Sequence, residues 1–181
     1  MVSIFIVIFL TVIGGLLFMK PKSTAIHNEK QLFINMQQQL WESYKTFSIR
    51  SQNDIFEKHL TREVREQVVE TKQLPEALIE EIRQFHEALQ REITNLKEQA
   101  PHQSAQNKEC WQNFIVYLEA RYIFLNKEWA YMRAILQSDE QALEATQLYR
   151  QAREKQNQQY RTFEMSVAQR VKKLKCRNLF A

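Results

Sequence analysis

Histidines, cysteines and clustered acidic residues are the side chains of this 181-residue sequence that could perform catalysis or bind a metal. A di-metal carboxylate bundle needs Glu-x-x-His on two helices, and the sequence contains neither that pattern nor His-x-x-x-His. The histidines are scattered, at His27, His59, His86 and His102. One run of glutamates at three- and four-residue spacing alternates with basic residues, as on an ordinary charged helix surface; it contains Glu63, Glu66 and Glu70. We therefore predict no catalytic residues, no metal site and no cofactor.

The two cysteines do not indicate a nucleophile or a disulfide. Cys110 is followed by Trp111 in an apolar helical stretch, where a buried, unreactive thiol is the expected state. Counting along two antiparallel helices from a turn at Ser138 places Cys110 and Cys176 about 15 Å apart. A disulfide requires Cα atoms within about 7 Å, so the pair is predicted to stay reduced.

Glycine is nearly absent, and this excludes several enzyme classes. The sequence contains two glycines, Gly14 and Gly15, where average usage gives roughly a dozen. Phosphate-binding loops, dinucleotide fingerprints and nucleophile elbows all need glycine at fixed positions. The sequence therefore predicts a protein that is not an enzyme and has no small-molecule substrate.

A basic cluster near the C-terminus is the strongest local signal. The net charge of +4 lies entirely after residue 138, because the earlier residues hold equal numbers of acidic and basic groups. The cluster consists of Arg170, Lys172, Lys173, Lys175 and Arg177. Cations favour a helix C-terminus in any protein, but they also bind an anionic membrane surface. We predict contact of these five residues with a membrane surface, and no specific binding of nucleic acid.

Aromatic residues are dense between Trp111 and Leu136. Most of them follow the three- and four-residue spacing of a buried seam, whereas three fall outside it: Tyr117, Phe124 and Tyr131. A helix that is apolar around so much of its circumference is either central in a bundle or offers a second face to a partner. We keep both interpretations, with Tyr117, Phe124 and Tyr131 as the candidate partner face.

These residues must be positioned by helices, because the hydrophobic period is helical throughout the body. Pro75 and Pro101 occupy the positions that proline tolerates at a helix start and just after a helix end. The pattern predicts helices over 29–72, 75–100, 104–137 and 139–175. Ser51, Gln52, Asn53 and Asp54 favour a turn, so the first helix could be divided into two. With four helices the C-terminal end returns to the start of the body, and with five it points away.

An apolar run from Val2 to Met19 carries no charged side chain. As a helix it spans roughly 27 Å, close to the apolar core of a bilayer. A signal peptide cleaved near Ser23 to Ala25 is the alternative, but Lys20 and Lys22 fall where such a peptide is uncharged. These lysines and Lys30 follow the run, so the positive-inside rule favours a cytoplasmic body.

The sequence thus predicts an all-α, single-pass membrane protein with a long antiparallel helical bundle or coiled coil of four helices, or of five if the first one divides. The expected divisions are an anchor over 1–20, a linker over 21–28, the bundle over 29–176 and a C-terminal tail over 177–181. The predicted function is a scaffold that organises or recruits proteins at the membrane surface. Its expected partners are the lipid bilayer and other membrane or cytoplasmic proteins, or itself as a homo-oligomer. The alternative is a component of an envelope-spanning secretion or lysis apparatus with a periplasmic coiled-coil body.

Overall fold

The computed structural model describes residues 25–49, 52–137 and 139–180. The predicted membrane helix over 2–19 lies outside these residues, and so does most of the predicted linker. Within the described ranges, no helix is both long and apolar enough to cross a bilayer. The described part of the predicted linker, from residue 25, is already helical, so the body begins four residues earlier than expected.

The body is built from helices alone in the part of the chain that the structure describes, which confirms the predicted all-α class. A helix over residues 25–44 continues into a π-helical turn, η1 (Lys45–Ile49). It is followed by α2 (Gln52–His59), α3 (Arg62–Thr71) and α4 (Glu76–Gln99). A 3-10 turn, η2 (Ala100–His102), leads to α5 (Lys108–Gln137) and then to α6 (Asp139–Leu174).

Of the two alternatives predicted for 29–72, the continuous helix is wrong and the division near Ser51 to Asp54 is found, but the structure also divides this range a second time. The helix that starts at residue 25 ends at η1, and α2 starts at Gln52, inside the predicted turn sequence. The second division precedes α3, where the Thr61 hydroxyl accepts a hydrogen bond from the Val64 amide and caps the new helix. At the end of α3, Lys72 takes the left-handed conformation (φ 57°) that glycine usually supplies. The Thr61 cap and the left-handed Lys72 therefore begin and end α3 without a glycine.

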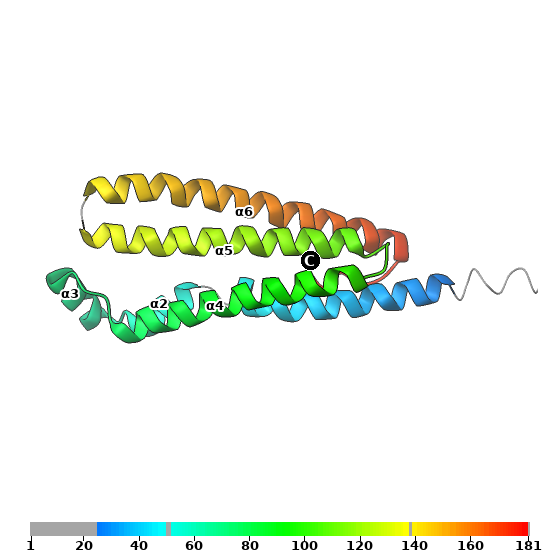
Figure 1. Ribbon diagram of the computed structural model, residues 1–181, viewed down its shortest axis with the longest axis horizontal. Coiled ribbons are helices and arrows are strands. Elements are labelled where there is room, and N and C mark those ends of the chain that lie inside the picture. Colours follow the sequence, from blue (N-terminus) through cyan, green and yellow to red (C-terminus); the bar gives the residue numbers. More distant parts are fainter. Residues whose placement is uncertain (1–24, 50–51, 138, 181) are drawn as a thin grey trace, which may run out of the picture.

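These divisions do not reverse the direction of the chain. The described helices therefore form four segments, which we call legs, side by side along one rod-shaped molecule (Figure 1). The first leg covers residues 25–71, the second is α4, and the third and fourth are α5 and α6. We call the end that holds residue 25 and the end of α6 the proximal end, and the end that holds α3 and the α5–α6 turn the distal end. The expectation that a break would turn the C-terminus away from residue 25 is therefore wrong.

Two hydrophobic cores lie along the rod. The proximal core joins the helix over 25–44, α4, α5 and α6 around Phe33, Trp111, Phe114 and Phe163, each fully buried. The distal core is smaller and joins α2, α3 and α4, with the ring of Trp129 from α5 stacked on Phe56. Phe85 packs against both cores.

The C-terminal tail belongs to the bundle, contrary to the predicted boundary at residue 177. The chain turns back after α6, and Phe180 enters the proximal core, where it is 6% exposed. The centroid of its ring lies 4.9 Å from that of Phe163 and 5.5 Å from that of Trp41, and both pairs are packed edge to face. The Leu179 amide donates to the Gln37 side chain, which in turn donates to the carbonyl of Arg177. These contacts attach the last residues to the first helix.

Candidate interaction surfaces

The predicted basic cluster lies at the proximal end, but its five members are not equivalent. Lys172, Lys173, Lys175 and Arg177 are exposed. Arg170 is not, because its guanidinium donates to the Glu29 carboxylate at 2.7 Å and lies over the ring of Phe33. The side chains of Arg170 and Glu29 are 12% and 27% exposed. Arg170 is therefore a structural residue, and the surface cluster is reduced to four cations.

One further hydrogen bond and one backbone turn hold this cluster beside the first turns of the body. The Lys30 ammonium donates to the carbonyl of Lys175 at 3.1 Å, which joins the first turns of the body to the residue after α6. Lys175 itself has a positive φ of 48°, the left-handed conformation that turns the chain back over the first helix. The exposed cations are consequently held beside the first described turns of the body.

The predicted partner face on α5 is not a surface. Tyr117 is 3% exposed and Phe124 is 7% exposed, and both belong to the proximal core. The Tyr117 hydroxyl donates to Ser48 at 2.8 Å, and burial raises its pKa. Tyr131 is half-buried and stacks on Tyr149 of α6, with ring centroids 5.6 Å apart. The excess aromatic residues therefore make α5 the central helix, because α6 covers the side that the other legs leave open.

A buried polar layer that sequence reasoning missed lies at the break in the first leg. The Gln52 side chain is fully buried, and its carbonyl accepts a hydrogen bond from His86 Nε2 at 2.8 Å. The same amide donates to the Glu128 carboxylate at 3.0 Å, so it connects an imidazole on α4 to a carboxylate on α5. Burial lowers the pKa of His86, which a hydrogen bond with Asn126 opposes, and burial raises the pKa of Glu128. The layer fixes the start of α2 against both helices.

Arg121 extends this layer toward α6. Its Nε donates to the carbonyl of Phe47 in the π-helical turn at 3.1 Å, and its Nη1 donates to Gln156 at 3.3 Å. The guanidinium also lies over the Phe124 ring. A polar cavity of about 270 Å³ opens beside it, lined by Arg121, Phe124, Glu128, Tyr149, Arg153, Gln156 and Asn157. Since Arg121 is 8% exposed and hydrogen-bonded in two directions, its evident role is to hold the π-helical turn against α6.

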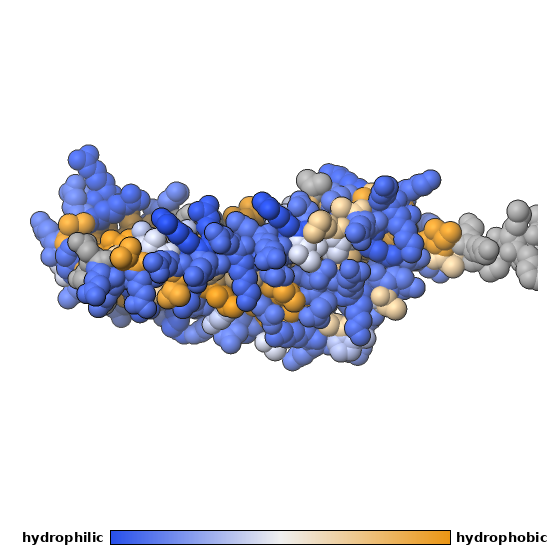
Figure 2. Space-filling model, turned by 90° about the horizontal axis from the view of Figure 1, so that it is seen from above, coloured by the Kyte–Doolittle hydropathy of each residue, from blue (hydrophilic) through white to orange (hydrophobic). Residues whose placement is uncertain are grey.

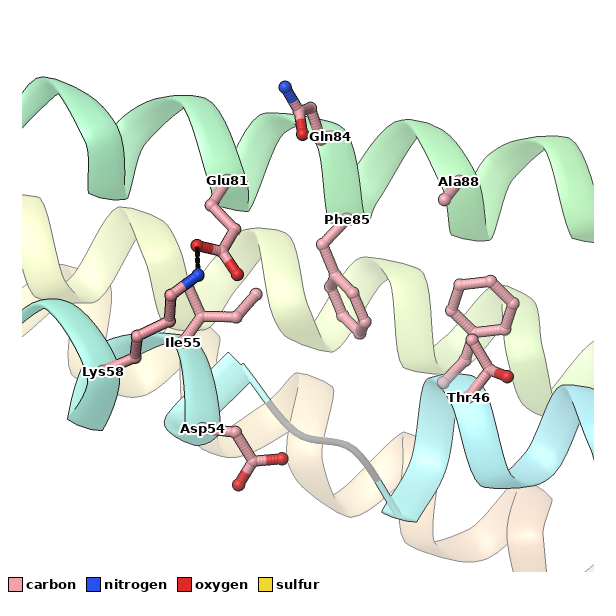
Figure 3. A pocket seen from close by; sticks show the side chains of 9 residues that line it. Thr46, Asp54, Ile55, Lys58, Glu81, Gln84, Phe85 and Ala88 are labelled. Carbon is pink, nitrogen blue, oxygen red and sulfur yellow. Dashed lines mark hydrogen bonds and ion pairs between the residues drawn. The ribbon is translucent and has the colours of Figure 1, made fainter.

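A groove with an apolar floor lies between α4 and the break (Figure 3). Its volume is about 460 Å³, and its apolar lining residues include Phe47, Ile55 and Phe85. Figure 3 shows Ile55 and Phe85 facing each other across the groove, with the Lys58–Glu81 ion pair (2.7 Å) beyond them. Hydrogen bonds from Lys58 and His59 lower the pKa of Glu81.

Exposed aliphatic residues occur along the whole rod. Figure 2 shows hydrophobic residues in a broken row between hydrophilic neighbours. In the described residues the large exposed ones are Ile26, Leu32, Ile49, Val69, Ile79, Ile123, Ile135, Leu143, Leu148 and Met165. Four of the ten belong to the distal elements: Val69 to α3, Ile79 to the first turn of α4, and Ile135 and Leu143 to the α5–α6 corner. The distal end is thus a second candidate surface for partner contact.

The residues considered for catalysis stay apart in the structure. In the described ranges no three His, Cys, Asp or Glu side chains are grouped as a metal ion would require. His59 contacts Glu81 at the groove, whereas His86 belongs to the buried layer and His102 is exposed at the proximal end. Cys110 is 1% exposed, and burial raises the pKa of its thiol, which disfavours the reactive thiolate.

Comparison of the chain with protein-family models, curated proteins and solved structures finds no match. The class of protein therefore has to be argued from the architecture and the surfaces described above.

Proposed function

We propose that this protein is a single-pass, membrane-anchored helical scaffold that organises or recruits partner proteins at the membrane surface. The observation that supports this proposal best is that the start of the first helix and the end of α6 lie side by side. Residue 25 follows the apolar run by a few residues, and the end of α6 is bonded beside it through Lys30, Lys175 and Arg170. A bilayer that contains residues 2–19 would thus meet one end of the rod and leave the other end free.

The length of α5 and α6 supports the proposed role at the membrane surface. The 36 residues of α6 extend about 54 Å, and the 30 residues of α5 extend about 45 Å. A rod of this kind holds its distal end well beyond the lipid headgroups. The exposed aliphatic side chains near the α5–α6 corner, such as Ile135 and Leu143, would then face proteins at the surface, including a second copy of the chain.

The groove of Figure 3 supports the recruiting role at mid-height of the rod. Its floor of Phe47, Ile55 and Phe85 is apolar, whereas its rim carries the charged pair Lys58 and Glu81. An apolar floor with a polar rim is the usual composition of a protein-binding patch. We expect a partner helix to insert an aliphatic side chain between Ile55 and Phe85.

Extraction and topology test the anchor. The full chain should stay with the membrane in alkaline carbonate, whereas Ile8→Arg should be released, because a charge at the centre of the span costs about 3 kcal/mol. A reporter fused to the C-terminus should be active in the cytoplasm. Release of the unmodified chain by carbonate would contradict the anchor. A periplasmic reporter signal would contradict the orientation and favour the envelope-spanning apparatus.

Site-specific photocrosslinking tests recruitment. A photoreactive residue at Gln84, which lines the groove, should give defined adducts in intact membranes. The same residue at Gln151, exposed on α6, is the matched control. Adducts from Gln84 that clearly exceed those from Gln151 support the groove as the contact. Equal adducts from Gln84 and Gln151 would show that the groove is not a preferred surface.

A further inference from the structure

The proximal end combines exposed cations with exposed aliphatic side chains, a pair of features that suits a lipid surface. Lys172, Lys173, Lys175 and Arg177 are exposed there, and no acidic residue follows Glu164 in the sequence. The neighbouring loop after η2, residues 103–107, carries no charge. The end of α4 and the start of α5 each add one exposed base and one exposed acid, Lys97 with Glu98 and Lys108 with Glu109, so they leave the net charge of this end to the cations that follow Glu164.

Two aliphatic residues on the first helix accompany these cations. Ile26 is 59% exposed and Leu32 is 53% exposed, and both belong to the helix over residues 25–44. Glu29, on the same helix, does not oppose the cations, because it is paired with Arg170. Aliphatic side chains beside lysines are the composition by which helices lie against the headgroup region.

We infer that the proximal end binds anionic phospholipid headgroups, with Lys172, Lys173 and Lys175 contacting the phosphates and Ile26 and Leu32 entering the headgroup region. The inference rests on the proposed anchor, which places this end at the bilayer. It adds that the body stands on the leaflet and does not hang freely from residues 20–24. Charge complementarity selects an anionic leaflet, because each basic residue near such a surface strengthens binding about fivefold.

Lysine acetylation of the full chain in bilayers measures the contact without any substitution. In phosphatidylcholine bilayers that contain 30% phosphatidylglycerol, acetylation of Lys172, Lys173 and Lys175 should be at least fivefold slower than in phosphatidylcholine alone. Lys155, exposed in the middle of α6, is the internal control and should react equally in both. Salt at 0.5 M should remove most of the protection, because it screens exposed charges. Equal rates in the two bilayers would overturn the inference.

Thermal unfolding in detergent micelles separates lipid binding from simple proximity. Added phosphatidylglycerol should raise the Tm of the full chain by about 5 °C, since a ligand that binds the native state stabilises it. The triple variant Lys172→Gln, Lys173→Gln, Lys175→Gln should lose most of this rise. The matched variant Arg150→Gln, Lys155→Gln, Arg161→Gln removes three exposed cations from the rest of α6 and should keep it. Loss of the rise in both variants would indicate a general charge effect and refute the assignment.

Two further results keep this inference distinct from the proposed anchor. Inorganic phosphate at the same concentration should leave the Tm unchanged, and an equal rise with phosphate would replace the lipid by a free anion. Carbonate extraction that releases the chain would refute the anchor alone, because the Tm rise with phosphatidylglycerol does not need a membrane span. A chain that resists extraction but shows no lipid-dependent protection would refute the inference alone.

Discussion

The guanidinium of Arg170 on α6 donates to the Glu29 carboxylate at 2.7 Å, across 141 positions of sequence. This bond, together with the one from Lys30 to the carbonyl of Lys175, closes the proximal end of the rod. It also removes one member from the basic cluster that the sequence suggested. The pair therefore defines both how the first and last legs meet and which cations remain available at the surface.

Arg170→Met should lower the free energy of unfolding by about 2 kcal/mol. The substitution leaves the Glu29 carboxylate without its partner at a site where both side chains are largely buried. Arg62→Met is the control. The side chains of Arg62 and Glu66 form an ion pair but are 90% and 70% exposed, so this pair should contribute less than about 0.5 kcal/mol to the free energy of unfolding. Urea unfolding of the full chain in detergent measures both. Equal losses in the two variants would contradict the structural role of Arg170.

Phe180→Ala should cost about 2–3 kcal/mol, below the usual range for a core phenylalanine, because the tail is able to detach and leave the rest folded. The ring lies among Trp41, Tyr44 and Phe163 and is 6% exposed. Met165→Ala, which removes a 59% exposed side chain of α6, should change stability by less than about 0.5 kcal/mol. Thermal unfolding compares the two. A Phe180→Ala variant as stable as Met165→Ala would mean that the tail is not part of the core.

Stability should fall as the pH drops below about 6.5, and His86 should account for part of the fall. Because burial lowers its pKa in the folded state, the unfolded chain binds a proton first, and protonation favours unfolding. The buried Glu128 carboxylate acts in the opposite direction, since its raised pKa makes folding more favourable as the pH falls toward 4.5. The difference between the unmodified chain and His86→Gln isolates the histidine. Urea unfolding between pH 5 and pH 8 should show a shallower slope for the variant, and an unchanged slope would contradict the assignment.

Lys72→Gly should stabilise the protein by roughly 0.5–1 kcal/mol. Lys72 has a φ of 57° at the end of α3, a conformation in which a side chain is strained and glycine is not. The same substitution at Lys155, inside α6, should destabilise by about 1 kcal/mol because glycine weakens a helix interior. The two variants thus differ in sign, and thermal unfolding distinguishes them. Destabilisation by Lys72→Gly would show that the lysine makes contacts that outweigh its strain.

The helical class and the helices that follow residue 75 were predictable, because hydrophobic residues at three- and four-residue spacing dominate the sequence. The end of α5 at Gln137 and the start of α6 at Asp139 agree with the expected boundary at Ser138. The second division of the first leg was not expected. Thr61 reads as one more polar residue in a helical pattern, although its hydroxyl caps α3 through a local hydrogen bond from the Val64 amide.

The interaction surfaces were predictable only in part. The basic cluster follows from charge alone, but the pairing of Arg170 with Glu29 depends on which legs are neighbours, and spacing within one helix does not contain that information. Tyr117 and Phe124 are buried although they fall outside the three- and four-residue spacing, because α6 covers a second side of α5. The sequence of α5 alone does not show which helix covers that side. The layer of Gln52, His86 and Glu128 gives no sequence signal, because its members come from three separate helices.

The central claim is that the rod stands on the bilayer by its proximal end. Energy transfer from a single dye to headgroup-labelled lipid tests it directly in the full chain, with Cys176 replaced by Ser and the dye placed at Lys173→Cys or Glu140→Cys. Both positions are exposed on α6 and lie 33 residues apart, about 50 Å along the helix. The account predicts strong transfer from position 173 and weak transfer from position 140. Equal transfer from both positions, or stronger transfer from position 140, would contradict it.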